Sequence, residues 1–178
     1  MASQKPLPRR ASFWVTIALT VVVLVLDQLS KIWAVSALEP GTRTPVVGTL
    51  IQFQLAFNTG GAFSSGAGTT WIFTIFSGLA AIAIIVFAWS VRSIPWAIGL
   101  GALLGGAASH FGDRLLRGGS LGNGYVIDFI DYFGWFIGNL ADIAIVGSIV
   151  YMAILAMMRV PWRDPAGQPA THAETTTA

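Results

Sequence analysis

Two aspartates, Asp128 and Asp142, are the residues of this sequence whose type and spacing best fit catalytic chemistry. The segment between them is rich in glycine and aromatic residues, and it is long enough for the chain to turn at a membrane surface and re-enter as a helix. Both carboxyl groups could then reach one point. Because two close carboxylates ionise together only at a high energetic cost, they share one proton. Such a pair can activate a water and polarise a carbonyl group, which is peptide hydrolysis by acid–base catalysis.

Asp142 interrupts an otherwise apolar run, and a carboxyl group in such a run has several interpretations. It can be a structural polar group bonded to a neighbouring helix, a relay in a proton- or ion-coupled transporter, or part of a catalytic site. Asn139 precedes it by three residues, on the same face of a helix, so its amide could bond the aspartate or a substrate. Asp131 is a weaker candidate, since we expect it near an interface where water solvates it. The titration belongs to the pair, so the acid and base roles stay open.

The composition indicates an integral membrane protein. Hydrophobic residues make up 54% of the 178 positions and charged residues only 10%, whereas a soluble domain carries about 25% charged residues. The net charge of +2 is too small and too scattered for a nucleic-acid surface. Cysteine is absent, and the two histidines, His110 and His172, lie far apart, so the sequence predicts neither a metal site nor a cofactor.

Apolar stretches of the length of a membrane span recur along the chain. The first resembles a cleavable signal peptide, with a basic start and small residues after it. Asp27 and Lys31 argue against cleavage, because they lie between the apolar core and that site and can pair at i and i+4 on one helical face. Four transmembrane helices are therefore predicted, at about residues 12–34, 71–91, 95–111 and 135–158.

A different pattern occupies residues 51–57, which alternate strictly between large apolar residues and glutamine or alanine. This period of two predicts a half-buried strand. A strand with an open edge cannot lie in hydrocarbon, so a small β element, about residues 43–66, should rest on the membrane surface. The predicted fold class is mainly α and integral to the membrane, with one four-helix domain at residues 1–160 and a disordered tail at residues 161–178.

Basic residues set the expected orientation. Those near both termini and in the loop between the second and third spans fall on one side of the membrane. The positive-inside rule places that side, and so both termini, in the cytoplasm. The predicted strand, Asn58 and Asp128 are then extracytoplasmic, and Asp142 lies about one to two helical turns below the outer surface.

Charged residues reappear in the sequence where the third span should leave the bilayer. We expect Asp113 and Arg114 to form a local ion pair that braces the top of this span. We expect His110, at the same level, to cap the helix or snorkel toward the interface rather than to catalyse. Glycines within the span, Gly101 and Gly105, have the spacing that lets helices approach closely.

These residues resemble a known family, the lipoprotein signal peptidases, which are the type II signal peptidases of bacteria. The resemblance covers about residues 20–150. It rests on five motifs in order: D-Q-L-S-K at 27–31, N-T-G-G-A-F-S at 58–64, G-G-A at 105–107 leading to D-R at 113–114, V-I-D-F-I-D at 126–131 and N-L-A-D at 139–142.

The resemblance implies a four-span aspartic endopeptidase, with Asp128 and Asp142 as the catalytic residues and a small extracytoplasmic β-cradle that holds the substrate. That substrate is a prolipoprotein, cut just before a cysteine that carries a diacylglyceryl group. The family is blocked by globomycin, needs no cofactor, and works in the bacterial cytoplasmic (inner) membrane; we expect a monomer in contact with membrane lipid. Residues expected to bind substrate or support the site are Asn58, Gly60, Arg114, Asn139, His110, Asp113, Asp27 and Lys31.

The chain departs from the family pattern in two places. Ser109 and His110 stand where the family usually has glycine and asparagine, and Phe136 and Gly138 stand where it usually has proline and phenylalanine. His110 can still donate or accept a hydrogen bond, and its titration could make the activity sensitive to pH. The alternatives to the peptidase are a small proton- or ion-coupled transporter, a divergent inactive paralogue, and a structural assembly subunit.

Overall fold

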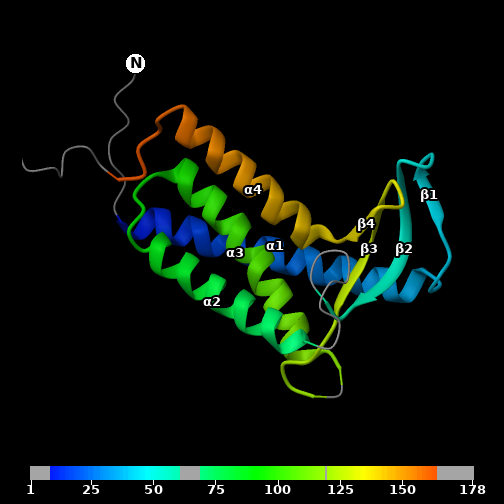
Figure 1. Ribbon diagram of the computed structural model, residues 1–178. Helices are drawn as coiled ribbons and strands as arrows, with labels where there is room; N and C mark the ends of the chain where they lie inside the picture. Colours follow the sequence, from blue (N-terminus) through cyan, green and yellow to red (C-terminus); the bar gives the residue numbers. More distant parts are fainter. Residues whose placement is uncertain (1–8, 61–68, 119, 164–178) are drawn as a thin grey trace, which may run out of the picture.

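The computed structural model describes residues 9–60, 69–118 and 120–163, in which four helices form a bundle with a small sheet at one end (Figure 1). All four helices are long and apolar enough to cross a membrane. The first helix begins, and the fourth ends, at the end of the bundle away from the sheet, as an even number of crossings requires. In chain order the helices are α1 (Arg9–Ala37), α2 (Thr70–Ala88), α3 (Ile94–Leu116) and α4 (Leu140–Met157).

Helix α3 is the centre of the bundle and packs against the other three helices. Its small residues make this possible. A Cβ atom on Gly101 would lie 2.8 Å from the Thr16 carbonyl oxygen of α1, and one on Gly106 would lie 2.7 Å from the Ala141 carbonyl oxygen of α4. Backbones this close leave no room for a side chain, which supports close packing through the third-span glycines.

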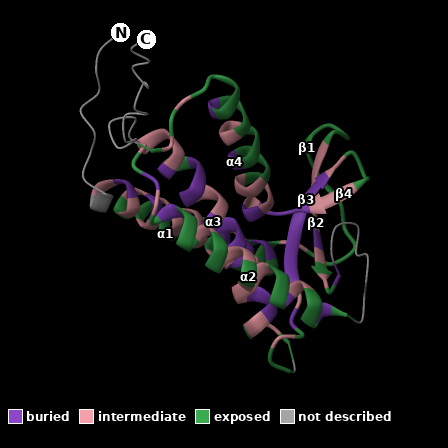
Figure 2. Cartoon of the chain, turned by 60° about the vertical axis from the view of Figure 1, so that its left-hand side comes forward, coloured by how far each residue is buried: buried purple, intermediate pink, exposed green. Residues whose placement is uncertain are grey.

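Much of the surface of the other helices is exposed (Figure 2), and many of the exposed residues there are large and apolar. Phe76, Leu79 and Val86 of α2 are among the most exposed side chains of the chain, as are Val146 and Met157 of α4. Such a surface is unstable in water but suits contact with lipid. The burial pattern therefore agrees with a protein whose bundle lies in a bilayer.

The sheet has four antiparallel strands in the order β1-β2-β3-β4. The strand expected at 51–57 is confirmed as β2, and it pairs with β3, whose register places Ala56 opposite Asp128. Residues 61–66 of the expected β element lie outside the described residues, as does the expected tail from residue 164 onward. The strands are β1 (Thr44–Val47), β2 (Ile51–Asn58), β3 (Val126–Tyr132) and β4 (Phe136–Gly138).

The chain forms a hairpin where the sequence predicted the start of the fourth span. Phe133 and Gly134 have positive φ angles of 59° and 73°, so the backbone turns sharply between β3 and β4. The Asp131 carboxylate stabilises this turn by accepting a hydrogen bond of 2.8 Å from the Gly134 N–H. Helix α4 therefore begins at Leu140 rather than near residue 135.

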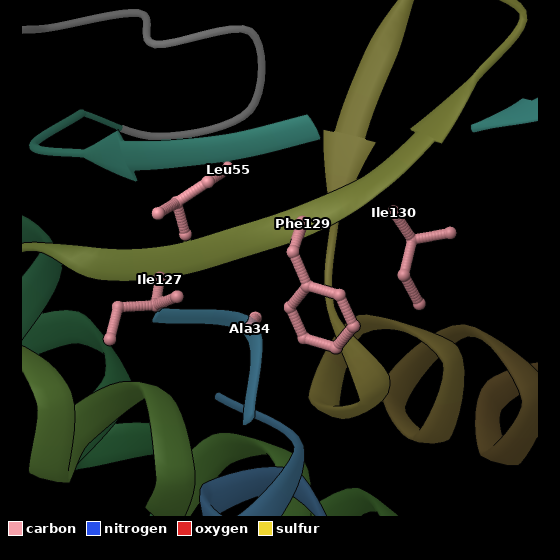
Figure 3. Close-up of a cluster of buried hydrophobic side chains, with 5 residues drawn as sticks. All are labelled: Ala34, Leu55, Ile127, Phe129 and Ile130. Carbon is pink, nitrogen blue, oxygen red and sulfur yellow. The ribbon is translucent and has the colours of Figure 1, made fainter. Parts of the chain in front are cut away.

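A cluster of apolar side chains joins the sheet to the end of α1 (Figure 3). Ala34 contributes from α1, Leu55 from β2, and Ile127, Phe129 and Ile130 from β3, and all are less than 10% exposed. Each large apolar side chain buried in this way stabilises the fold by about 1.5–3 kcal/mol. The cluster holds β3, the strand that carries Asp128, in a fixed place above the bundle.

Candidate active site

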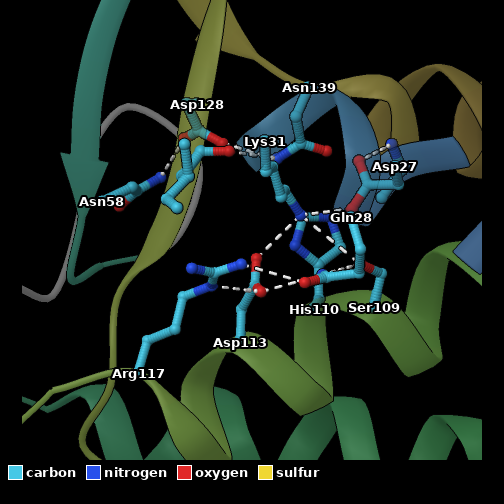
Figure 4. Close-up of polar contacts among 12 residues, drawn as sticks. Asp27, Gln28, Lys31, Asn58, Ser109, His110, Asp113, Arg117, Asp128 and Asn139 are labelled. Carbon is cyan, nitrogen blue, oxygen red and sulfur yellow. Dashed lines mark hydrogen bonds and ion pairs between the residues drawn. The ribbon is translucent and has the colours of Figure 1, made fainter. Parts of the chain in front are cut away.

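Asp128 lies in the middle of β3, and its carboxyl group is 4% exposed. Two amide groups donate to it: Asn58 Nδ2 to Oδ2 at 3.0 Å and Asn139 Nδ2 to Oδ1 at 2.6 Å (Figure 4). Burial, and then the nearby charge of Asp142, raise the pKa of Asp128 to about 6, although the two amides oppose the shift. The carboxyl group can therefore keep a proton under mildly acidic conditions.

Asp142 lies in the first turn of α4, and its side chain is 27% exposed. Its Oδ2 accepts a hydrogen bond of 2.9 Å from the backbone N–H of Asn139, and its Oδ1 lies 3.1 Å from His110 Nε2. The position near the N-terminus of the helix favours a negative charge there. Asp142 is thus held by groups from α3 and from the start of α4.

Asn139 joins the two aspartates, but not in the way the sequence suggested. It precedes α4 as the N-cap instead of sharing a helical face with Asp142, because its backbone is extended (φ −141°, ψ −174°). Its side-chain oxygen accepts from the Asp142 N–H at 3.1 Å, while the Asp142 carboxylate accepts from the Asn139 N–H, which completes a capping box. The same side chain donates to Asp128, so one buried residue sets the position of both acids.

The two acids line an apolar cavity of about 590 Å³ that runs between α2, α3 and α4. Asn58, His110 and Arg114 share its polar end with the aspartates. The rest of the wall consists of apolar or small side chains, including Phe73, Phe76, Ala80, Ala83, Leu103 and Ile145. The shape suits a ligand with a long apolar part and one polar group that reacts.

Arg114 closes the polar end. It is 6% exposed and donates through Nη2 to the Gly60 carbonyl oxygen, which follows β2. Its guanidinium also lies 5.2 Å from the centre of the Phe73 ring, within cation–π range. The second guanidinium nitrogen, Nη1, has no hydrogen-bond partner among the described residues and could bind a carbonyl or carboxylate group of a ligand.

Asp113 and Arg114 do not form the ion pair that the sequence led us to expect. Asp113 instead lies 2.7 Å from Lys31 Nζ and 2.7 Å from Arg117 Nε. Neighbouring residues of a helix point in different directions, so Asp113 faces α1 while Arg114 faces the cavity. The expected pair of Asp27 and Lys31 is present at 2.5 Å, and both side chains are fully buried.

Asp27 connects this buried network to the start of α4. Its Oδ1 accepts a hydrogen bond of 2.8 Å from the Ala141 N–H, next to Asp142, and its Oδ2 accepts from Ser109. These bonds tie α1, α3 and α4 together (Figure 4). The network also includes Gln28, whose partners Ser109, Asp113 and Arg117 are more than 80 residues away along the chain, so the sequence did not single it out.

Two further expectations need correction. His110 does not cap or snorkel; it contacts Asp142 in the cavity, because α3 continues to Leu116 and the histidine lies two turns before its end. Asp131 is not solvated but 1% exposed, since β3 is buried on both faces from Val126 to Asp131. Its carboxylate accepts from the Gly134 N–H, and Arg43 Nε lies 3.4 Å away.

In the sequence, Phe136 is notable only as a departure from the family pattern. In the structure its side chain lines the cavity together with both acids. Its place follows from β4, a strand of three residues that pairs with β3. A segment of three residues is too short for its sequence pattern to predict a strand. The hairpin is recognised only from the pairing of β4 with β3.

A bundle of four apolar helices, with two carboxyl groups held at the polar end of an apolar cavity, defines a membrane enzyme. The chain belongs to the signal peptidase (SPase) II family, whose model matches residues 19–158. It is thus a peptidase by family.

Known relatives agree with this assignment. The chain is 35% identical to a lipoprotein signal peptidase of Mycobacterium avium over 156 residues, which cover 88% of this chain and 85% of that protein. It is also 35% identical to one of Bifidobacterium longum subsp. infantis over 139 residues, with 78% and 76% covered.

Solved structures share the fold. One bacterial membrane enzyme, determined at 2.3 Å by the in meso method, matches with a TM-score of 0.72, at 22% identity, over 84% of this chain and 92% of its own. A second, determined at 1.9 Å, matches with a TM-score of 0.69, at 24% identity, over 82% and 94%.

Proposed function

We propose that this protein is an aspartic lipoprotein signal peptidase that cuts a prolipoprotein just before its diacylglyceryl-modified cysteine. The observation that carries the proposal is the pair formed by Asp128 and Asp142, joined through Asn139 at the polar end of an apolar cavity. Family membership supplies the reaction class, and the names of the relatives supply the kind of substrate.

In this reaction the pair holds a single proton. The ionised aspartate takes a proton from a water, whose oxygen attacks the carbonyl carbon of the scissile bond. The protonated aspartate donates to the carbonyl oxygen as negative charge develops there. When the C–N bond breaks, the leaving amine receives a proton from the protonated aspartate. A hydroxyl group of the intermediate gives its proton to the other aspartate as the product carboxyl group forms, so the pair again holds a single proton. The raised pKa of Asp128, which stems from burial and from the charge of Asp142, supports a pair that retains this proton.

Neighbouring polar groups orient the pair. Asn58, Asn139 and His110 place donors or acceptors on the carboxyl oxygens, so the two acids point in fixed directions before substrate arrives. Arg114 is held by the Gly60 carbonyl oxygen and keeps one nitrogen for the substrate backbone. Asp27, Lys31 and Asp113 act from the buried network beneath the pair, as positioning residues.

The substrate fits the geometry of the cavity. A signal peptide is an apolar helix, and the cavity between α2, α3 and α4 offers it an apolar wall. Acyl chains on the cysteine can remain in the surrounding lipid. The scissile bond then lies at the level of the sheet, which we place at the extracytoplasmic face of the bacterial inner membrane with both termini in the cytoplasm.

A transporter would need polar groups along a path through the membrane. The buried charges of the described helices instead gather at the sheet end, where Asp27, Lys31, Asp113 and Arg117 neutralise one another. No observation therefore favours that alternative over the peptidase.

The test uses Asp128→Asn and Asp142→Asn separately, with a lipidated precursor as substrate. We expect each variant to lose at least 1,000-fold in rate, since the asparagine can neither take nor give the proton; this is of the order seen when a catalytic acid or base is removed. Glu39→Gln is the matched control, because Glu39 is an exposed carboxylate. Cleavage by either aspartate variant at the wild-type rate would refute the pair. Globomycin should also raise the unfolding temperature of the purified monomer.

A further inference from the structure

A second cavity, of about 260 Å³, opens on the sheet side of the two acids. Its wall is more polar than that of the first cavity and includes Arg43 beside Phe57 and Trp135. The cavity lies among the strands and the β3–β4 turn. Three residues line both this cavity and the apolar one between the helices: Asn58, Asp128 and Phe136. Asp128 is thus reached from both cavities, and Phe136 stands between them.

The Phe136 ring is firmly placed. It stacks on Tyr132, the residue opposite it in the hairpin, with ring centres 6.2 Å apart and planes 22° apart. It also covers Gly138, since a Cβ atom added there would lie 2.7 Å from Phe136 Cε1 and 2.9 Å from Asp142 Oδ2. The ring therefore occupies the space beside Asp142 that a side chain at position 138 would need.

We propose that Phe136 determines substrate specificity, by limiting the size of the side chain directly before the scissile bond. The inference rests on the proposed function. A peptide bond that reacts at the pair must lie beside Asp128, where the two cavities meet. The side chains on either side of that bond must then lie next to the Phe136 ring. The residue after the cut is the lipidated cysteine in every substrate, so the side chain that varies at this point is the one before it.

The physical effect is steric exclusion. Phe136 packs against Tyr132 and lies close to Gly138, so moving the ring aside would disturb these contacts. A large side chain before the cut would push the ring or move the carbonyl carbon away from the acids. Misplacement by about 1 Å is enough to cost about 100-fold in rate.

The test compares two lipidated precursors that differ only at this position, one with alanine and one with leucine. The measured quantity is the ratio of kcat/KM for alanine over leucine, which does not depend on the fraction of enzyme that is folded. We expect the wild type to favour alanine strongly and Phe136→Ala to reduce this ratio about tenfold or more, the scale on which an apolar pocket discriminates. Phe133→Ala is the matched control, because Phe133 is 63% exposed in the same hairpin and should leave the ratio unchanged.

The outcomes separate the two proposals. Equal losses on both precursors in Phe136→Ala, with an unchanged ratio, would overturn the role of Phe136 and leave the peptidase intact. A wild-type enzyme that cuts neither precursor would overturn the proposed function itself.

Gly138→Ala offers an independent test of the contact. In the wild-type background the new methyl group meets the ring and Asp142, whereas in the Phe136→Ala background it meets only Asp142. We expect the rate lost through Gly138→Ala to be several-fold smaller in the second background. Equal losses in both backgrounds would show that the ring does not occupy this space, and would overturn the proposal.

Discussion

Asn139 Nδ2 lies 2.6 Å from Oδ1 of Asp128, although the two residues belong to different elements, the N-cap of α4 and the middle of β3. Through its backbone N–H and its side-chain oxygen the same asparagine also holds Asp142. The distance between the two acids therefore depends on how α4 starts. Helix capping, usually a matter of stability, here sets the geometry of the two acids.

Asn139→Ala should lower both stability and activity. It removes the cap of α4, worth about 1 kcal/mol, and a hydrogen bond to a buried carboxyl group, worth about 1.5–3 kcal/mol. We expect kcat to fall at least 100-fold because neither acid keeps its orientation. Thermal unfolding in detergent and single-turnover cleavage measure the two effects.

Ser93→Ala is the control for capping alone, since Ser93 is the N-cap of α3 but its side chain makes no capping hydrogen bond. It should change neither quantity. An Asn139→Ala enzyme that loses stability but keeps the wild-type kcat would contradict the link between capping and catalysis.

The ionisation of Asp128 should make stability depend on pH. Burial, followed by the charge of Asp142, raises its pKa from 3.8 to about 6, so the folded protein binds a proton that the unfolded chain releases. The resulting advantage is complete below about pH 4 and is lost as pH rises through about 6, a change of about 3 kcal/mol. Asp128→Asn should abolish this step in the unfolding free energy. A profile with the same step in both proteins would assign it to another group.

His110→Ala and His110→Asn should behave differently. Alanine leaves Asp142 Oδ1 without the partner that now lies 3.1 Å away, and we expect kcat to fall about tenfold. Asparagine can restore a hydrogen bond to Asp142, so its kcat should stay within about threefold of the wild type. A His110→Asn enzyme whose kcat falls as far as that of His110→Ala would mean that position 110 does not act through a hydrogen bond to Asp142.

Lys31→Met should destabilise the fold by about 3–5 kcal/mol, because it leaves Asp27 and Asp113 buried without their shared cation. The start of α4 should loosen as well, since Asp27 bonds the Ala141 N–H. Arg92→Met is the control, as Arg92 is exposed in the α2–α3 connection and should change stability by less than about 1 kcal/mol. Chemical denaturation in detergent compares the two, and equal effects would remove the special role of the buried network.

Local patterns in the sequence predicted most of the fold. Apolar runs long enough to cross a bilayer predicted the helices, and the alternation at 51–57 predicted β2. The types and order of the acids singled out Asp128 and Asp142 before any geometry was known. These features can be predicted from local sequence, because the length of a span and the period of a strand are properties of consecutive residues.

Only the tertiary structure decided which polar groups meet. The sequence paired Asp113 with its neighbour Arg114, yet Asp113 contacts Lys31 of α1. It left Asp131 in solvent, and it left the partner of β2 open, whereas β3 fills that place and buries Asp131. Likewise, the bond from Asp27 to the start of α4 spans more than 100 residues of chain. Such contacts depend on how whole helices and strands pack, and no local pattern carries that information.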